Sequence, residues 1–107
     1  MADRYDVSSL PTRELIPGHR GRFIHSAHTT HVYWQIEADA VLPEHSHPHE
    51  QIVNMLEGTY ELVVGGEHFV LSAGEVLVIP GGVVHGGRAH TDCRILDVFS
   101  PVREEYR

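Results

Sequence analysis

Two short histidine-containing segments hold the side chains of this sequence that are best suited to binding a metal. The first reads His45-Ser-His47-Pro-His49-Glu50-Gln51, and the second, Pro80-Gly-Gly-Val-Val-His85, ends forty residues after His45. Residues at even spacing along a strand point to one face, so we expect His45, His47 and Gln51 to face one centre. His85 follows a turn, after which a second strand would bring it opposite. Three imidazoles and one amide oxygen favour a divalent transition metal (Ni, Fe, Mn, Zn or Cu) over Ca or Mg.

His49 has the same spacing and is the alternative to Gln51 as the fourth ligand. Pro48 cannot donate a hydrogen bond to a neighbouring strand, which indicates a bend that turns His49 either toward the centre or outward. Glu50 is expected to face away from the metal. A single His-x-His pair is often only two surface histidines, but a second motif at this distance favours a metal site. We interpret the other histidines mostly as surface residues: His19, His25, His28, His31, His68 and His90.

An aspartate stands in a strongly apolar segment near the C-terminus. If residues 93–99 form a strand, Asp97 shares one face with Cys93, Ile95 and Phe99. A buried carboxylate is costly unless it is paired or bound. Asp97 is therefore salt-bridged, or at the rim of a barrel, or part of a site. Arg103 follows this segment and, taken alone, reads as an ordinary exposed arginine.

Short strands separated by turns are needed to position these side chains. Alternation is clear within residues 31–40, where Val32, Trp34, Ile36 and Ala38 share one face. The pair Gly65-Gly66 indicates a two-residue hairpin. Further strands are predicted at residues 14–16, 22–27, 51–56, 60–64, 68–71, 76–79, 83–88 and 93–99. Many short strands without an amphipathic helix predict an all-β barrel or sandwich.

Length and composition suit one domain. The chain has 107 residues, 41% of them apolar, so we expect a single domain over residues 1–107, with an irregular N-terminal arm at 1–20 and a charged tail at 100–107. A formal charge of −7 argues against nucleic acid or an anionic membrane as a partner. Cys93 is the only cysteine, so no internal disulfide can form. The N-terminal residues lack an apolar signal segment, which makes the cytoplasm the expected location.

The spacing of the histidine motifs resembles the two signature motifs of the cupin superfamily. His45-x-His47-x3-Gln51-x6-Gly58 corresponds to the first motif, and Gly74-x5-Pro80-x-Gly82-x2-His85 to the second. The resemblance implies an all-β, single-domain cupin, a double-stranded β-helix or jelly-roll barrel with a metal in its mouth. Gln51 stands where this superfamily usually has glutamate, and Ala89 where it often has asparagine. A neutral ligand set leaves the bound cation more electrophilic and more attractive to an anionic substrate.

Residues from about Pro43 to Tyr106 are also similar to the KdgF-type cupins, the pectin-degradation proteins. The similarity rests on the first histidine segment and on Asp97-Val-Phe99-Ser-Pro101-Val-Arg103-Glu-Glu-Tyr106. It implies a homodimer with a divalent metal that opens and ketonises 4,5-unsaturated monouronates, small anionic sugars released by pectin or alginate lyases. By position, the implied metal ligands are His45, His47, Gln51 and His85. The implied catalytic and substrate-contact residues are Asp97, Phe99 and Arg103.

The implied chemistry suits these residue types. Asp97 in an apolar setting would have a raised pKa and can act as a general acid and base. Arg103 can bind the substrate carboxylate with two parallel hydrogen bonds, and Phe99 would shape the pocket. Two alternatives stay open at this point. One is a small cupin dioxygenase or metal-dependent isomerase, and the other is a non-catalytic cupin that binds a sugar or another metabolite.

Overall fold

The computed structural model describes all 107 residues and contains ten strands and two 3-10 turns. The strands are β1 (Arg13–Ile16), β2 (His19–His25), β3 (Thr30–Ile36), β4 (Val41–His45), β5 (Glu50–Glu57), β6 (Tyr60–Val64), β7 (Glu67–Leu71), β8 (Val76–Ile79), β9 (His85–Ala89) and β10 (Cys93–Ser100). The turns are η1 (Val7–Ser9) and η2 (Glu104–Tyr106). The chain is thus all-β, as the sequence predicts.

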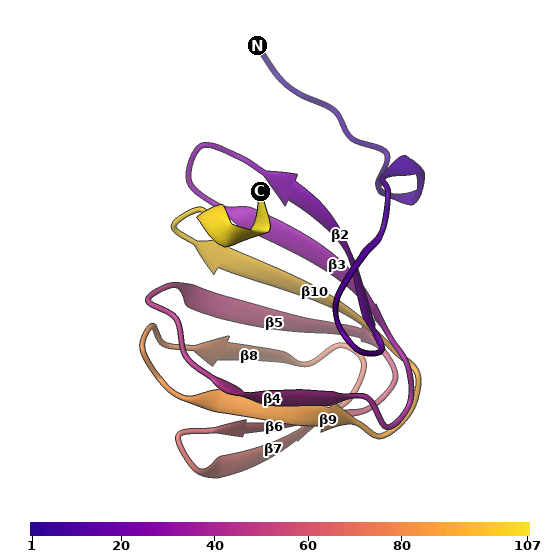
Figure 1. Ribbon diagram of the computed structural model, residues 1–107, viewed down its shortest axis with the longest axis vertical. Coiled ribbons are helices and arrows are strands. Elements are labelled where there is room, and N and C mark those ends of the chain that lie inside the picture. The colour runs from indigo at the N-terminus through magenta and orange to yellow at the C-terminus, as the bar shows by residue number, and fades with distance from the viewer.

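Two antiparallel sheets face each other, as Figure 1 shows. The six-stranded sheet has the order β1-β2-β3-β10-β5-β8, and the four-stranded sheet has the order β4-β9-β6-β7. Buried side chains from both sheets fill the space between them, among them Val32, Ile95 and Leu62. This arrangement confirms the predicted cupin-type barrel, because each sheet turns one apolar face toward the other.

Strands β3 and β10 carry the predicted alternation and form the centre of the larger sheet. Along β3, Val32, Trp34 and Ile36 are buried while the residues between them are half exposed. Strand β10 pairs with β3 on one side and with β5 on the other, and it buries every second residue from Cys93 to Phe99. Asp97 is one of these inward-facing residues, so the register that buries the core also buries a carboxylate.

Strand β4 is the element that the sequence pattern does not predict. It contains Pro43, lacks clear alternation, and has mostly exposed residues. It lies at the edge of the four-stranded sheet and pairs only with β9. Proline is tolerated on an edge strand because no second neighbour needs its missing N–H. Pairing with β9 therefore gives this segment a strand conformation that its local sequence does not indicate.

The predicted hairpin at Gly65-Gly66 joins β6 to β7. Gly65 has φ 55° and Gly66 has φ 84°, which is the left-handed backbone that a tight two-residue hairpin turn requires at both positions. Between β4 and β5 the chain bends at Pro48 and His49, as the proline predicts. This bend carries the chain from the smaller sheet to the larger one, and it does so at one end of the barrel.

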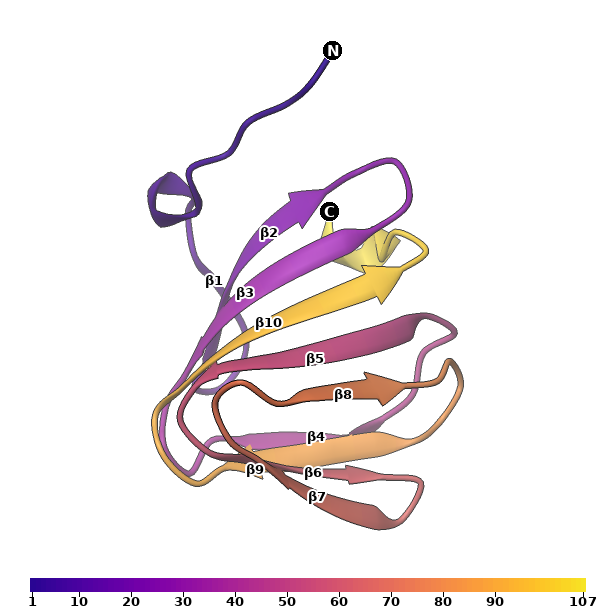
Figure 2. The ribbon, with the colours of Figure 1, turned by 180° about the vertical axis from the view of Figure 1, so that it is seen from behind.

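Both ends of the chain lie beside the β2, β3 and β10 part of the larger sheet, away from the four-stranded sheet (Figures 1 and 2). In Figures 1 and 2 the first residues extend away from the barrel, whereas the C-terminal turn η2 folds back beside β10 and β3. The tail is anchored by the Arg103 backbone N–H, which donates to Thr30 Oγ1 over 2.9 Å.

No helix of the chain is long and apolar enough to cross a membrane.

Candidate metal centre

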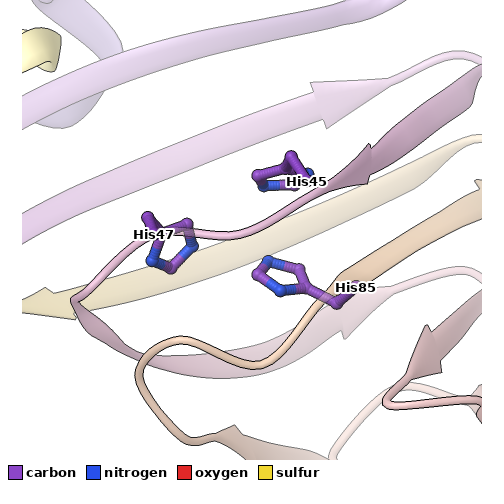
Figure 3. A group of neighbouring side chains, drawn as sticks. All are labelled: His45, His47 and His85. Carbon is purple, nitrogen blue, oxygen red and sulfur yellow. The ribbon is translucent and has the colours of Figure 1, made fainter.

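Three histidine rings converge where the two sheets meet at one end of the barrel. His45 is the last residue of β4 and pairs directly with His85, the first residue of β9. His47 lies in the loop that leads to β5. One nitrogen from each of these rings lies within 4.8 Å of the others, and Figure 3 shows the rings turned toward one another. The structure therefore brings together all three histidines that the sequence selects.

The reason for this convergence differs from the one that the spacing suggested. The prediction placed His45, His47 and Gln51 on one face through strand alternation. In the structure His45 belongs to the smaller sheet, His47 to the connecting loop, and Gln51 to β5 of the larger sheet. The alternation argument is therefore wrong, although the residues do meet. They meet because the chain crosses between the sheets at the barrel mouth.

Each of the three rings is oriented by a backbone carbonyl. The Nδ1–H groups donate to the carbonyl oxygens of Pro43 for His45 (3.0 Å), of His49 for His47 (3.1 Å) and of Val83 for His85 (2.9 Å). In a neutral imidazole this leaves Nε2 unprotonated. Three Nε2 lone pairs consequently face the same small volume, the arrangement that oriented histidine ligands show around a metal.

The surroundings favour the neutral form of the His47 and His85 rings. Burial is the main reason that the pKa of His47 falls to about 4, and the positive charge of Arg103 lowers it further. Burial likewise lowers the pKa of His85, whose Nε2 is buried without a hydrogen-bond partner. A buried acceptor without a donor is costly unless a cation or water satisfies it. The donor set therefore fits a divalent transition metal.

Gln51 adds an oxygen to the three ring nitrogens as a fourth candidate ligand atom. Its Oε1 lies 3.2 Å from Nε2 of His47, and its side chain is buried at the start of β5. With Nδ1 of His47 already donating to a carbonyl, Nε2 and Oε1 are two acceptors facing each other. A cation between them would remove the repulsion, which agrees with Gln51 as a ligand.

His49 is buried but does not join the three converging rings. Its ring centroid is 5.5 Å from that of His47 and 6.5 Å from that of Phe99, and its Nδ1 has no hydrogen-bond partner. Glu50 is exposed, as its position predicts. Between the two alternatives for the fourth ligand, the arrangement of side chains favours Gln51.

Asp97 lies in the middle of β10 with its carboxyl group inside the barrel. Trp34 Nε1–H donates to Oδ2 over 3.0 Å, and Oδ1 is buried without a hydrogen-bond partner. Burial raises the pKa of Asp97 to about 6, against the opposing influence of Gln51, Trp34 and Arg103. No positive side chain forms a salt bridge with it, so the simple explanation of a paired carboxylate is not met.

Arg103 is buried rather than exposed, contrary to the plain interpretation of its sequence position. Its guanidinium carbon lies 4.9 Å from the ring centroid of Phe99 and 4.1 Å from that of Tyr106. The Nε–H group donates to Glu105 over 2.6 Å. No salt bridge joins its terminal amino groups to a carboxylate of the protein.

One cavity is lined by several of these side chains. It is partly open to solvent and is lined mainly by apolar side chains. Its polar lining includes His45, Gln51, Asp97 and Arg103. An apolar cavity with a few converging polar groups is typical of a site for a small molecule.

Comparison with known proteins identifies the family. A family model described as the cupin domain matches residues 32–99, which is more than half of the chain. The chain is a cupin. No curated protein matches it.

Among solved structures, this cupin is similar to KdgF from Halomonas sp., with a TM-score of 0.93, 26% identity and full coverage of both chains. It is also similar to an RmlC-like cupin from Shewanella frigidimarina, with a TM-score of 0.93 and 24% identity over 100% of this chain and 97% of that one. The polyketide cyclase RemF from Streptomyces resistomycificus matches with a TM-score of 0.80 and 23% identity, over 94% of this chain and 80% of that one. Proteins with different activities thus share this fold, so the function must be inferred from the residues of the site and not from the fold.

Three side chains that line the cupin cavity were not assigned to a site from the sequence, namely Trp34, His19 and Tyr60. Trp34 was predicted to share a strand face with Val32 and Ile36, but its hydrogen bond to Asp97 was not foreseen. His19, interpreted as a surface residue, is 4% exposed, and its Nε2 accepts from the hydroxyl of Tyr60 over 3.2 Å. These contacts join residues that lie 63 and 41 positions apart in the sequence, so no local sequence pattern predicts them.

Proposed function

We propose that this cupin is a metal-dependent enzyme that opens and ketonises 4,5-unsaturated monouronates from pectin or alginate breakdown, giving the linear keto-deoxyuronate. The observation that carries the proposal is the buried, unpaired carboxyl of Asp97, which shares one cavity with His45, Gln51 and Arg103. Full-length similarity to KdgF from Halomonas sp. supports the same activity. We further propose that the protein acts in the cytoplasm as a homodimer.

The reaction is an isomerisation in which protons move and no electron is lost or gained. The hydroxyl at C1 gives up its proton, the bond from C1 to the ring oxygen breaks, and an aldehyde forms at C1. The former ring oxygen takes up a proton in place of its bond to C1 and becomes the hydroxyl of an enol at C5. A proton then adds to C4, and the enol loses its hydroxyl proton to become a ketone. An enzyme needs an acid and base near these atoms and a positive environment for the oxygens that carry negative charge.

Asp97 provides the acid and base. With a pKa of about 6, its carboxyl can be present in both protonation states near neutral pH, which general acid and base catalysis requires. The Trp34 indole fixes Oδ2, so Oδ1 is the oxygen left to exchange protons with the substrate. In this proposal the two carboxyl oxygens therefore have different roles.

Arg103 and Phe99 bind and enclose the substrate. The terminal amino groups of Arg103 can bind the uronate carboxylate in a bidentate pair, a geometry that only arginine offers. The Phe99 ring packs beside both His47 and the guanidinium, where it excludes water. A divalent ion held by His45, His47, His85 and Gln51 would supply Lewis-acid stabilisation of negative charge on substrate oxygens. Because these ligands are neutral, the site keeps a positive charge toward an anionic sugar.

One assay tests the proposal. Purified, metal-analysed protein is mixed with the monouronate that an alginate or pectin lyase releases, and loss of the ultraviolet absorbance of the enol ether is followed. Turnover above the spontaneous rate that a chelator abolishes is the expected result. Asp97→Asn should retain the metal and lower kcat at least about 100-fold, the usual loss when a general acid and base is removed. Arg103→Ala should mainly raise KM.

The same experiment separates the alternatives. Oxygen consumption by the Fe(II)-loaded protein, without turnover of the unsaturated uronate, would support a dioxygenase instead. Binding of a uronate without turnover, unaffected by Asp97→Asn, would support a binding module. An unchanged rate in Asp97→Asn would remove the role assigned to that residue.

A further inference from the structure

The C-terminal tail forms a tight enclosure around one side chain of the cavity. Arg103 has a side-chain exposure of only 10%. An arginine side chain loses much rotamer freedom when it is fixed in this way, which lowers affinity if the loss occurs only on ligand binding. An enclosure that fixes the guanidinium beforehand would remove this cost.

Three contacts within the protein fix the guanidinium. Its carbon lies 4.1 Å from the ring centroid of Tyr106 and 4.9 Å from that of Phe99, and its Nε–H donates to Glu105 over 2.6 Å. Aromatic rings attract a cation placed near their faces. Glu105 thus occupies Nε, and no carboxylate of the protein pairs with the two terminal amino groups. The side of the guanidinium that can bind a carboxylate in a bidentate pair is thereby free.

Tyr106 is itself held by strands from the other end of the chain. Its ring packs edge-on against Phe23 of β2, with the centroids 5.2 Å apart, and against Phe99, with the centroids 5.6 Å apart. Its carbonyl oxygen accepts hydrogen bonds from Arg13 of β1 over 2.5 Å and from Nε2 of His25 of β2 over 3.2 Å. The tail turn is therefore tied to the first two strands, although about eighty or more residues of sequence separate them.

We propose that Tyr106 is a positioning residue, whose ring holds the Arg103 guanidinium in the orientation that binds the substrate carboxylate. The inference rests on the proposed function, since it assigns the guanidinium a uronate carboxylate as its ligand. The ring, not the hydroxyl, does this work. Removing the ring should therefore weaken substrate binding about tenfold, the size expected for a cation–π contact in a partly desolvated site, and should change kcat little.

The first test measures the guanidinium without any substrate. In ¹⁵N-labelled protein, the heteronuclear NOE of the Arg103 Nε–H group reports its motion, and the signal is assigned by its loss in Arg103→Lys. We expect a value close to that of the rigid backbone in wild type and in Tyr106→Phe, and a clearly lower value in Tyr106→Leu. Tyr5→Leu is the matched control, because Tyr5 is 48% exposed on the N-terminal arm. An unchanged NOE in Tyr106→Leu overturns the proposal.

The second test uses the uronate assay. Tyr106→Leu should raise KM about tenfold, while Tyr106→Phe and Tyr5→Leu keep the wild-type KM. In an Arg103→Ala background, Tyr106→Leu should cause little further loss, because it acts through the missing side chain. Losses that multiply in the double variant, or an equal effect of Tyr106→Phe, would contradict a role of the ring through Arg103.

Two further arms keep the outcome clear. If Tyr106→Leu does not fold, Arg13→Ala loosens the same turn from the protein surface and should lower the Arg103 NOE, and no change there overturns the proposal. If wild-type protein turns over no unsaturated uronate, the proposed function fails, and the NOE alone decides whether Tyr106 holds the guanidinium. Failure of the function and failure of the positioning role are thus distinguishable.

Discussion

Replacing Asp97 by asparagine should stabilise the metal-free protein at neutral pH, even though it removes the proposed acid and base. The carboxyl is buried, and only its Oδ2 has a hydrogen-bond donor, Trp34 Nε1–H. An asparagine amide oxygen can accept the same bond. The substitution therefore removes a buried negative charge and keeps the contact that holds the side chain.

The size and sign of this effect follow from the raised pKa. The carboxyl titrates at about 6 in the folded protein, against 3.8 for an unperturbed aspartate. Between these values the folded protein holds a proton that the unfolded chain has released, so stability falls as the pH rises through this window. Above pH 6 the ionised, buried carboxyl destabilises the folded protein to the full extent. At about 1.4 kcal/mol per pKa unit, this destabilisation amounts to about 3 kcal/mol.

The measurement is urea-induced unfolding of chelator-treated protein, wild type against Asp97→Asn, from about pH 4 to about pH 7.5. His47, whose pKa is lowered to about 4, produces the opposite slope, because the unfolded chain takes up the proton first on acidification. That contribution is present in both proteins and cancels in their difference. We expect the stability advantage of the variant to grow by about 3 kcal/mol across the range. A difference that does not change with pH would refute the assignment of Asp97 as a buried, perturbed carboxyl.

Three more outcomes are expected. His85→Ala should weaken Ni(II) or Mn(II) binding at least about 100-fold in calorimetric titration. His49→Ala, which changes the buried histidine outside the converging rings, should leave metal binding nearly unchanged. Equal losses of affinity in the two variants would reject the ligand assignment. Trp34→Phe should lower the free energy of unfolding of the metal-free protein at neutral pH by about 1–3 kcal/mol, because Asp97 Oδ2 loses its hydrogen-bond donor. Denaturant-induced unfolding measures this difference, and an unchanged free energy of unfolding would contradict the prediction. Light scattering should give a mass of about twice the 12.0 kDa of one chain, and a monomer mass would reject the homodimer.

Several strands could be predicted because their signal is local. The alternation at Val32, Trp34 and Ile36 marks a strand with one buried face, and the pair Gly65-Gly66 marks the hairpin between β6 and β7. Such signals depend only on neighbours in sequence. Strand β4 gave no comparable signal, because an edge strand with Pro43 and exposed side chains is formed by its pairing with β9 rather than by its own residues.

The three converging histidines were predicted from the sequence, but the way in which the chain brings them together was not. Residue type and motif spacing selected His45, His47 and His85, which do converge. The assumed common strand was wrong, since the ligands come from two sheets and a loop. The burial of His19 was missed for the same reason, because a single histidine in a short segment carries no sign of the distant tyrosine that it contacts.

The sequence alone determined which donors exist and in what order they occur: imidazoles and one amide, an aspartate in an apolar strand, and an arginine beyond it. Only the tertiary structure decided that the Nε2 atoms face one volume, that Asp97 keeps one free oxygen in the same cavity, and that Arg103 is held by the tail. The physical reason is that residue chemistry and alternation are local, whereas burial, ring orientation and the meeting of two sheets depend on contacts between residues far apart in the chain.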